Sequence, residues 1–258
     1  MTDRCSVEGK TAIVTGASRG IGRAIAEAFA ADGADVVGCS RSREDVEAVV
    51  EGIEAGDAAG RALGVECDVR DRESVEAMVD AAVEAFGGVD VLVNNAGASF
   101  MADFEEISPN GWKTIVDINL HGTFHCSQAA GERMRDRDGG VIVNFASRAG
   151  LRLSPRMSHY GAAKAGVINL TASLAHEWAS DGIRVNCIAP GLVATPGVES
   201  QMGIEAGEID RDDTDRRVGT SEEIADVARF LASSASSYIN GETIPVKGVP
   251  RFVESTGE

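Results

Sequence analysis

The sequence predicts an α/β fold in which a doubly wound parallel sheet of about seven strands carries helices on both faces. Short apolar runs alternate along the 258 residues with segments whose apolar residues recur at helical spacing. This alternation is typical of βαβ units, in which a helix connects two parallel strands and covers one face of the sheet. The 30 glycines and 5% aromatic residues also favour close helix-on-sheet packing over a β-sandwich.

The strand candidates are apolar runs bounded by turn residues. They lie at residues 11–16, 35–40, 63–69, 89–97, 141–147, 183–191 and 242–248. Two clear helix candidates between them, residues 24–33 and 74–88, close on glycine, which favours a helix C-cap. No linker, repeat or low-complexity segment divides the sequence, so we expect residues 1–258 to form a single domain.

Two segments depart from this regular alternation. Residues 192–219 are long, polar and only weakly periodic, which predicts a mobile substrate lid. Residues 249–258 are expected to form a C-terminal tail that is ordered only in part.

Composition excludes several classes of partner. The net charge of −17 argues against nucleic acid and anionic membrane, which need a basic surface. The chain has neither a signal peptide nor an apolar run of about 18 residues, so we expect a soluble, cytoplasmic protein. The histidines are too scattered for a metal site. The cysteines form no CxxC pair, which predicts buried thiols in a reducing compartment; they are Cys5, Cys39, Cys67, Cys126 and Cys187.

Only four of the 24 basic residues are lysines. An acidic, lysine-poor surface is typical of proteins adapted to high salt, because counterions screen the repulsion between dense carboxylates. The sequence therefore predicts a halophilic protein, and a GC-rich genome is the alternative explanation.

A glycine-rich turn follows the first strand candidate. In TGASRGIG, Gly16, Gly20 and Gly22 let the backbone approach a pyrophosphate, and the helix that follows offers its free N–H groups. The position of this turn between a strand and an amphipathic helix is what dinucleotide binding requires. We expect Ser18, Arg19 and Ile21 to contact the cofactor as well.

The end of the second strand candidate indicates which cofactor is used. A domain that prefers NAD carries an acid there for the ribose 2′-hydroxyl, whereas this chain has Ser40 and Arg41. Arg41, helped by Arg19, suits the 2′-phosphate of NADP(H), so we expect NADP(H) to be favoured over NAD(H). A solvated surface arginine is the alternative. Asp68 would accept a hydrogen bond from the adenine amino group or cap the following helix.

A tyrosine and a lysine four residues apart carry the chemistry. On a helix, Tyr160 and Lys164 lie on one face, and Ser147 ends a strand upstream. A neighbouring ammonium lowers the pKa of a phenol from about 10 toward neutrality, where it can transfer a proton. His159 should point away from Tyr160, since adjacent helical residues diverge by about 100°.

These motifs together resemble the short-chain dehydrogenase/reductase family. The resemblance rests on TGASRGIG, NNAG at 94–97, Asn119 in VDIN, Ser147, the Tyr160 and Lys164 pair, and PGLVAT at 190–195. It extends over nearly the whole chain and is strongest to 3-oxoacyl-thioester reductases. It implies a Rossmann-type fold, a nicotinamide cofactor and a homo-oligomer. Lys247 and Val249, in place of the family's usual residues, leave the oligomer open between tetramer and dimer.

The resemblance also implies a role for each matching residue. Tyr160 would transfer the proton, Ser147 would bond the substrate oxygen, and Lys164 would hold the nicotinamide ribose. Asn119 would hold a water that links Lys164 to solvent, with a structural amide as the alternative. Further cofactor contacts are expected from Val69, Asn95, Ala96, Gly97, Pro190, Gly191, Val193 and Thr195, while Asn94 would help to shape the cleft.

We expect substrate contacts from residues 99–101, 148–157 and 192–219. Their apolar side chains suggest an apolar pocket, and Arg152 or Arg156 would meet an anionic group unless both are ordinary solvated charges. The leading hypothesis is an NADP(H)-dependent carbonyl reductase acting on a 3-oxoacyl thioester or related ketone. A sugar or polyol dehydrogenase, and a non-catalytic nucleotide-sensing protein on the same fold, are the alternatives.

Overall fold

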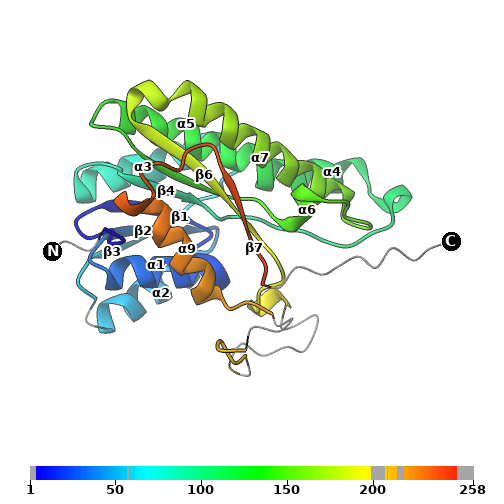
Figure 1. Cartoon of the computed structure of the whole chain (residues 1–258), viewed down its shortest axis with the longest axis horizontal. Helices are drawn as coiled ribbons and strands as arrows, with labels where there is room; N and C mark the ends of the chain where they lie inside the picture. Colours follow the sequence, from blue (N-terminus) through cyan, green and yellow to red (C-terminus); the bar gives the residue numbers. More distant parts are fainter. Residues whose placement is uncertain (1–3, 57, 199–206, 208, 214–217, 249–258) are drawn as a thin grey trace.

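The computed structural model describes residues 4–56, 58–198, 207, 209–213 and 218–248. At its centre lies a parallel sheet of seven strands in the order β3-β2-β1-β4-β5-β6-β7 (Figure 1). The fold is the expected α/β, Rossmann-type arrangement. The strands are β1 (Thr11–Thr15), β2 (Asp35–Ser40), β3 (Ala62–Glu66), β4 (Val91–Asn94), β5 (Gly140–Phe145), β6 (Ile183–Pro190) and β7 (Thr243–Val246).

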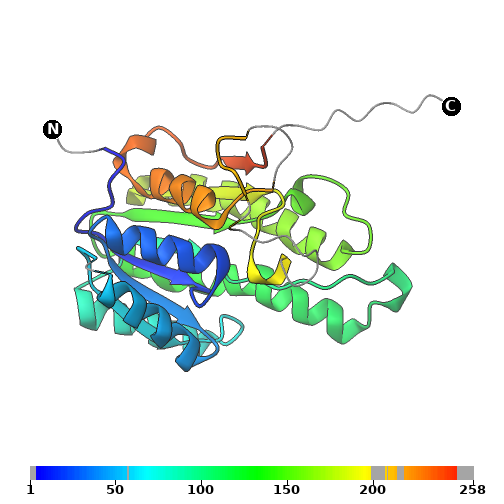
Figure 2. The same cartoon turned by 90° about the horizontal axis from the view of Figure 1, so that it is seen from below.

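Helices cover both faces of this sheet. One apolar core joins α1, α2 and α9 to one face, and a second joins α3, α5 and α7 to the other (Figures 1 and 2). The helices are α1 (Gly20–Ala31), α2 (Arg43–Ala55), α3 (Arg72–Phe86), α4 (Pro109–Val116), α5 (Gly122–Arg135), α6 (Arg148–Leu151), α7 (Ser158–Glu177) and α9 (Ser221–Ala232).

The central strands are buried on both faces, which explains their unbroken apolar sequences. Every residue of β1 and β4 is buried, whereas the edge strands β3 and β7 are only partly so. A strand covered by helices on both sides needs apolar side chains at every position rather than at alternate ones. The predicted strand boundaries shift by at most a few residues, because several of the predicted runs continue into the loops that form the site.

The order of the strands places the site. From β1 the chain proceeds to β2 and β3 on one side, then crosses back to β4 on the other side of β1. Where the direction of winding reverses, the chain leaves β1 toward α1 on one face of the sheet and leaves β4 toward α5 on the other, and a crevice forms at the carboxyl ends of the strands. The glycine-rich turn and the segment after Asn94 both lie there.

The predicted tail lies outside the described residues, and so does part of the predicted lid. The two ends of the 192–219 segment meet, since Ala194 N–H donates to the Gly219 carbonyl at 2.8 Å and Gly219 N–H to the Leu192 carbonyl at 3.0 Å. Residues 199–206, 208, 214–217 and the tail at 249–258 are not among those described.

Candidate active site

The turn between β1 and α1 is so tight that two of its glycines cannot carry a side chain. Gly16 has φ +68, and a Cβ there would lie 3.0 Å from the Cα of Ala96. A Cβ on Gly22 would lie 2.2 Å from the Gly16 carbonyl oxygen. These approaches bring the first turn of α1 close to the loop after β4.

Side-chain hydrogen bonds fix this turn to the loop after β4. The Asn95 amide donates to the carbonyls of Thr15 and Gly16 at 3.0 and 3.2 Å. In return, the Thr15 hydroxyl accepts the N–H groups of Asn95 and Ala96 at 3.1 and 3.0 Å. Asn95 therefore holds both walls of the crevice at a fixed separation.

The N-terminus of α1 is left open for a ligand. Five other helices begin with a side chain that accepts one of their first N–H groups, namely Ser42 for α2, Asp71 for α3, Ser108 for α4, Ser147 for α6 and Thr220 for α9. Arg19, at the N-cap of α1, makes no such bond, and the first turn of α1 has no acidic residue. Its N–H groups and partial positive charge therefore fit the pyrophosphate of a dinucleotide.

At the end of β2, Ser40 forms a local turn. Its hydroxyl donates to the Ser42 carbonyl at 2.7 Å and accepts the Ser42 N–H at 3.1 Å. Arg41 and Arg19 are both exposed. Within the described part of the chain no hydrogen bond or ion pair engages either guanidinium, so both are available to an anionic ligand.

Asp68 is paired with an arginine that the sequence did not single out. Arg70 Nη2 lies 2.5 Å from the Asp68 carboxylate and its backbone N–H donates to the same group at 3.0 Å. This hydrogen bonding lowers the pKa of Asp68, and the charge of Arg41 acts in the same direction. Asp68 does not cap the following helix. Asp71 does so, by accepting the Glu73 N–H at 3.2 Å, because α3 begins at Arg72, directly after Asp71.

Val69, the neighbour of Asp68, is buried. A Cβ on Gly122 would lie 2.6 Å from Val69 Cγ2, so α5 approaches this loop closely. His125 Nδ1 lies 3.0 Å from the Val69 carbonyl oxygen. Val69 is thus held in place by α5.

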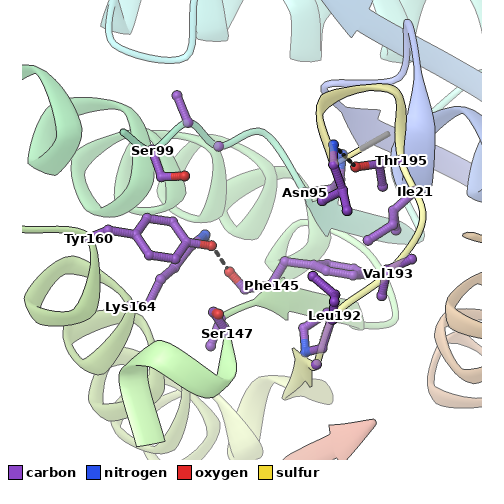
Figure 3. A pocket seen from close by; sticks show the side chains of 16 residues that line it. Ile21, Asn95, Ser99, Phe145, Ser147, Tyr160, Lys164, Leu192, Val193 and Thr195 are labelled. Carbon is purple, nitrogen blue, oxygen red and sulfur yellow. Dashed lines mark hydrogen bonds between the residues drawn. The ribbon is translucent and has the colours of Figure 1, made fainter. Parts of the chain in front are cut away.

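Ser147, Tyr160 and Lys164 meet at the end of β5 (Figure 3). Ser147 begins α6, and its hydroxyl accepts the Ala149 N–H at 3.2 Å. Tyr160 lies in the first turn of α7 and Lys164 one turn later, with Nζ 5.7 Å from the tyrosine ring centroid. Lys164 Nζ donates to the Phe145 carbonyl at 2.7 Å.

The structure does not give the expected lowering of the Tyr160 pKa. Burial raises the pKa of Tyr160, and a hydrogen bond with Ser147 opposes this shift only in part. Burial also lowers the pKa of Lys164 to about 8. The prediction considered only the positive charge of the neighbouring lysine, whereas burial disfavours both the phenolate and the ammonium.

Asn119 is fully buried in a π-helical turn, Asp117–His121, between α4 and α5. Its amide nitrogen donates to the carbonyls of Ala98 and Ile115 at 2.8 and 2.9 Å. Its oxygen has no hydrogen-bond partner among the described residues. The amide nitrogen therefore has the structural role considered above, while the amide oxygen lies beside Gly97, which lines the site.

Ser147, Tyr160 and Lys164 lie in the wall of a cleft of about 300 Å³. It is lined by Ile21, Asn95, Gly97, Ala98, Ser99, Phe145, Ala146, Ser147, Tyr160, Lys164, Pro190, Gly191, Leu192, Val193, Thr195 and Val198. The predicted residues outside this lining are Asn119, those of the glycine-rich turn and those of the loops after β2, β3 and β4, namely Gly16, Ser18, Arg19, Gly20, Gly22, Ser40, Arg41, Asp68, Val69 and Ala96.

Sequence reasoning missed some members of the site and misplaced one. Phe145 contributes a backbone carbonyl, which no sequence pattern reveals. Asn94 lies behind the cleft, where its amide donates to Ser127 and Asn144 at 2.9 Å each. Alternation along β4 turns Asn94 away from the neighbouring Asn95, so it joins the sheet to α5 instead of lining the cleft.

Comparisons with known proteins agree with this geometry. The family model described as Enoyl-(Acyl carrier protein) reductase matches residues 16–248. The chain is 40% identical over 248 residues to D-threitol dehydrogenase of Mycolicibacterium smegmatis, covering 94% of this chain and 93% of the relative. The chain belongs to the short-chain dehydrogenase/reductase family. It is therefore an NAD(P)-dependent oxidoreductase.

Other relatives in this family carry different activities in their names. The chain is 40% identical over 240 residues to 3-oxoacyl-(acyl-carrier-protein) reductase FabG of Staphylococcus aureus, covering 93% of this chain and 97% of the relative. A solved structure of a putative short-chain alcohol dehydrogenase from Sinorhizobium meliloti superposes with a TM-score of 0.86 at 40% identity, covering 95% and 98% of the two chains. Two relatives of equal identity thus differ in their named substrates.

Neither a metal site nor a membrane span is present within the described residues. They contain no cluster of three or more His, Cys, Asp or Glu residues that could hold a metal ion. In the same part of the chain, no helix has both the length and the apolar character needed to span a bilayer. Cys39, Cys67, Cys126 and Cys187 are buried free thiols, and Cys5 is partly exposed.

Proposed function

We propose that this protein is an NADP(H)-dependent reductase that interconverts a ketone and a secondary alcohol, with a 3-oxoacyl thioester or related ketone as substrate. The observation that carries the proposal is the convergence of Ser147, Tyr160 and Lys164 in one cleft beside an open helix N-terminus. A bound nicotinamide cofactor supplies hydride to the carbonyl carbon.

In this proposal Tyr160 donates the proton to the carbonyl oxygen as the alcohol forms. Its raised pKa keeps the phenol protonated at neutral pH, which is the state a proton donor needs in the reductive direction. Ser147 donates a hydrogen bond to the same oxygen, and its anchored position at the start of α6 fixes the oxygen near Tyr160.

Lys164 and Asn119 assist the proton transfer by Tyr160. Below its pKa of about 8, Lys164 is protonated and favours the negative charge that develops on the tyrosine oxygen. The same ammonium is the group we assign to the nicotinamide ribose. The unpartnered oxygen of Asn119 supports its assignment to a water that links Lys164 to solvent, from which Tyr160 would regain its proton after each reduction.

Two exposed arginines support the preference for NADP(H). Arg19 lies exposed at the N-terminus of α1, and Arg41 lies exposed directly after β2, where no carboxylate is present for a ribose 2′-hydroxyl. A charge-assisted hydrogen bond from Arg41 to a 2′-phosphate would discriminate between the two cofactors.

The lining of the cleft favours a substrate whose reacting end is uncharged. Lys164 is the single charged side chain among the described lining residues, and Phe145, Leu192 and Val193 contribute apolar residues to the lining. Arg156, considered above as a partner for an anionic group of the substrate, is already paired with Asp103 at 3.1 Å. A sugar or polyol remains the second candidate because D-threitol dehydrogenase is as similar in sequence as FabG.

The decisive experiment measures cofactor binding and turnover together. Dissociation constants for NADPH and NADH are measured by fluorescence. Oxidation of NADPH is then followed with a 3-oxoacyl thioester, a cyclic ketone and an aldose, and reduction of NADP⁺ with a polyol. Turnover of ketones but not of aldoses or polyols supports the proposal. Tight NADPH binding without turnover of any compound would instead support a nucleotide-sensing protein.

A further inference from the structure

Two loops on the substrate side of the cleft are joined to each other. The first, residues 98–103, follows β4 and carries Ser99. The second, residues 152–158, leads into α7 and Tyr160. Ala102 N–H donates to the Arg156 carbonyl at 3.0 Å, and Arg156 Nε lies 3.1 Å from the Asp103 carboxylate. Arg156 has φ 63, the single positive φ of a non-glycine residue in the described chain. Such a conformation persists only where the surroundings hold it.

A contact between two side-chain rings also joins these two loops, closer to the protein interior. The rings of Phe100 and His159 lie edge to face, with centroids 4.3 Å apart and planes at 72°. Phe100 also lies against α4, because a Cβ on Gly111 would be 3.1 Å from Phe100 Cζ. The inner edge of Phe100 is thus inserted between α4 and α7, although 40% of the residue remains exposed.

His159 occupies this position without forming hydrogen bonds through its ring. It is fully buried, and neither ring nitrogen has a hydrogen-bond partner of good geometry within the described residues. Burial lowers the pKa of His159, and the nearby Met157 backbone opposes this shift only in part. The buried imidazole is therefore neutral near pH 7 and contributes its shape rather than a charge.

Each ring lies one residue away from a side chain that lines the cleft. Phe100 follows Ser99, and His159 precedes Tyr160. Figure 3 shows Tyr160 between Ser99 on one side and Ser147 on the other. A displacement of Phe100 from His159 would therefore change the distance from Ser99 to Tyr160, and with it the width of the cleft where the substrate carbonyl is held.

We propose that Phe100, Arg156 and His159, called here the loop clamp, are positioning residues that hold Ser99 opposite Tyr160 and so determine which ketones fit the cleft. They touch no reacting atom and act through Ser99 and Tyr160. This inference rests on the proposed ketone reductase function. It adds that specificity is determined by the separation of two loops, with a narrow cleft that favours compact ketones over bulky ones.

The test compares His159→Ala, Phe100→Ala and their double variant with His159→Phe, which keeps an aromatic ring in place. Phe104→Ala is the matched control, since Phe104 is 69% exposed in the adjacent turn. Amide hydrogen exchange of residues 98–103 is measured first, without cofactor. KM and kcat for a compact and a bulky ketone and the NADPH dissociation constant follow.

We expect both alanine variants to accelerate exchange of residues 98–103 by about tenfold or more. The KM for the compact ketone should rise about tenfold, with kcat and NADPH binding within about threefold of the wild type. The double variant should resemble the single ones, since both remove the same contact. His159→Phe and Phe104→Ala should behave as the wild type.

Two results would overturn the loop clamp. One is unchanged exchange in both alanine variants, and the other is a His159→Phe protein that behaves like His159→Ala. If His159→Ala folds poorly, Phe100→Ala provides the same test at a partly exposed position. If the wild type reduces no ketone, the proposed function fails, whereas the exchange measurements still decide whether the clamp exists.

Discussion

Lys164 Nζ donates a 2.7 Å hydrogen bond to the backbone carbonyl of Phe145, two residues before Ser147. This bond connects α7 to β5 at the point where the proposed catalytic side chains meet. It also holds an ammonium group in a buried site, since only 3% of Lys164 is exposed to solvent. The fold therefore fixes the position of Lys164, but burial of its charge lowers the stability of the folded protein.

This cost predicts how stability depends on pH. The unfolded chain keeps the Lys164 proton up to its ordinary pKa of 10.5, whereas the folded protein releases it near 8. Between these values the unfolded state binds more protons, so the contribution of Lys164 to stability increases with pH. We expect wild type to gain on the order of 2 kcal/mol relative to Lys164→Met between about pH 8 and pH 10. Urea unfolding at several pH values measures this difference, and parallel curves for the two proteins would contradict it.

Replacement of Tyr160 by Phe should separate binding from chemistry. The variant keeps the ring and removes the hydroxyl that we assign as proton donor. We expect turnover to fall by about 10²- to 10⁴-fold while the NADPH dissociation constant stays within about threefold of the wild type. Stopped-flow reduction and fluorescence titration measure the two quantities. Full activity in Tyr160→Phe would refute the assignment.

Arg41→Ala tests the choice of cofactor. The loss of one charge-assisted contact should weaken NADPH binding by about 10- to 100-fold and leave NADH binding nearly unchanged. Arg43→Ala is a suitable control, because Arg43 is exposed two residues away and is already paired with Glu47 at 2.6 Å. An equal loss for both cofactors in Arg41→Ala would show that Arg41 does not read the 2′-phosphate.

The acidic composition predicts a response to salt. The chain carries 41 acidic and 24 basic residues, and raising ionic strength from about 0.1 M to about 1 M shortens the screening length from about 10 Å to about 3 Å. If the carboxylates repel one another in the folded state, the midpoint of thermal unfolding should rise across this range in KCl. A midpoint that is constant or falls would favour the genomic explanation of the composition.

Local patterns predicted the elements of the fold because each depends on neighbours in the chain. The boundaries of β2 coincide with the predicted residues 35–40, since both of its ends are marked by polar residues. Ser147, Tyr160 and Lys164 were likewise accessible from spacing alone. By contrast, the pairing of Asp68 with Arg70 was not predicted. Spacing along the chain does not show which of Asp68 and Asp71 caps α3 and which is left to pair with an arginine.

Contacts between distant segments were beyond the reach of these patterns. The approach of Phe100 to His159 joins residues from two different loops, and neither sequence spacing nor composition encodes it. The pKa of Tyr160 was predicted in the wrong direction for a related reason. A neighbouring lysine is visible in the sequence, but the burial that governs both groups is a property of the folded chain.

Gly97 and Asn119 provide a sharp test of how closely the site is packed. A Cβ on Gly97 would lie 2.8 Å from Asn119 Oδ1 and 3.6 Å from Lys164 Nζ. The side chain of Asn119 cannot move away easily, because its amide nitrogen is held by two backbone carbonyls. One added methyl group should therefore disturb the catalytic residues directly.

We expect Gly97→Ala to lower stability by about 1–3 kcal/mol through overpacking and to reduce kcat by at least about tenfold. In Gly97→Ala/Asn119→Ala the clash disappears, so the double variant should lose less stability than the two single changes combined. Gly52→Ala is the matched control, because Gly52 lies inside α2 and a Cβ there meets nothing within 4 Å. That control should gain about 0.5–1 kcal/mol. Urea unfolding and steady-state kinetics measure these effects, and a Gly97→Ala protein with unchanged stability and turnover would mean that the loop after β4 moves freely enough to admit the methyl group.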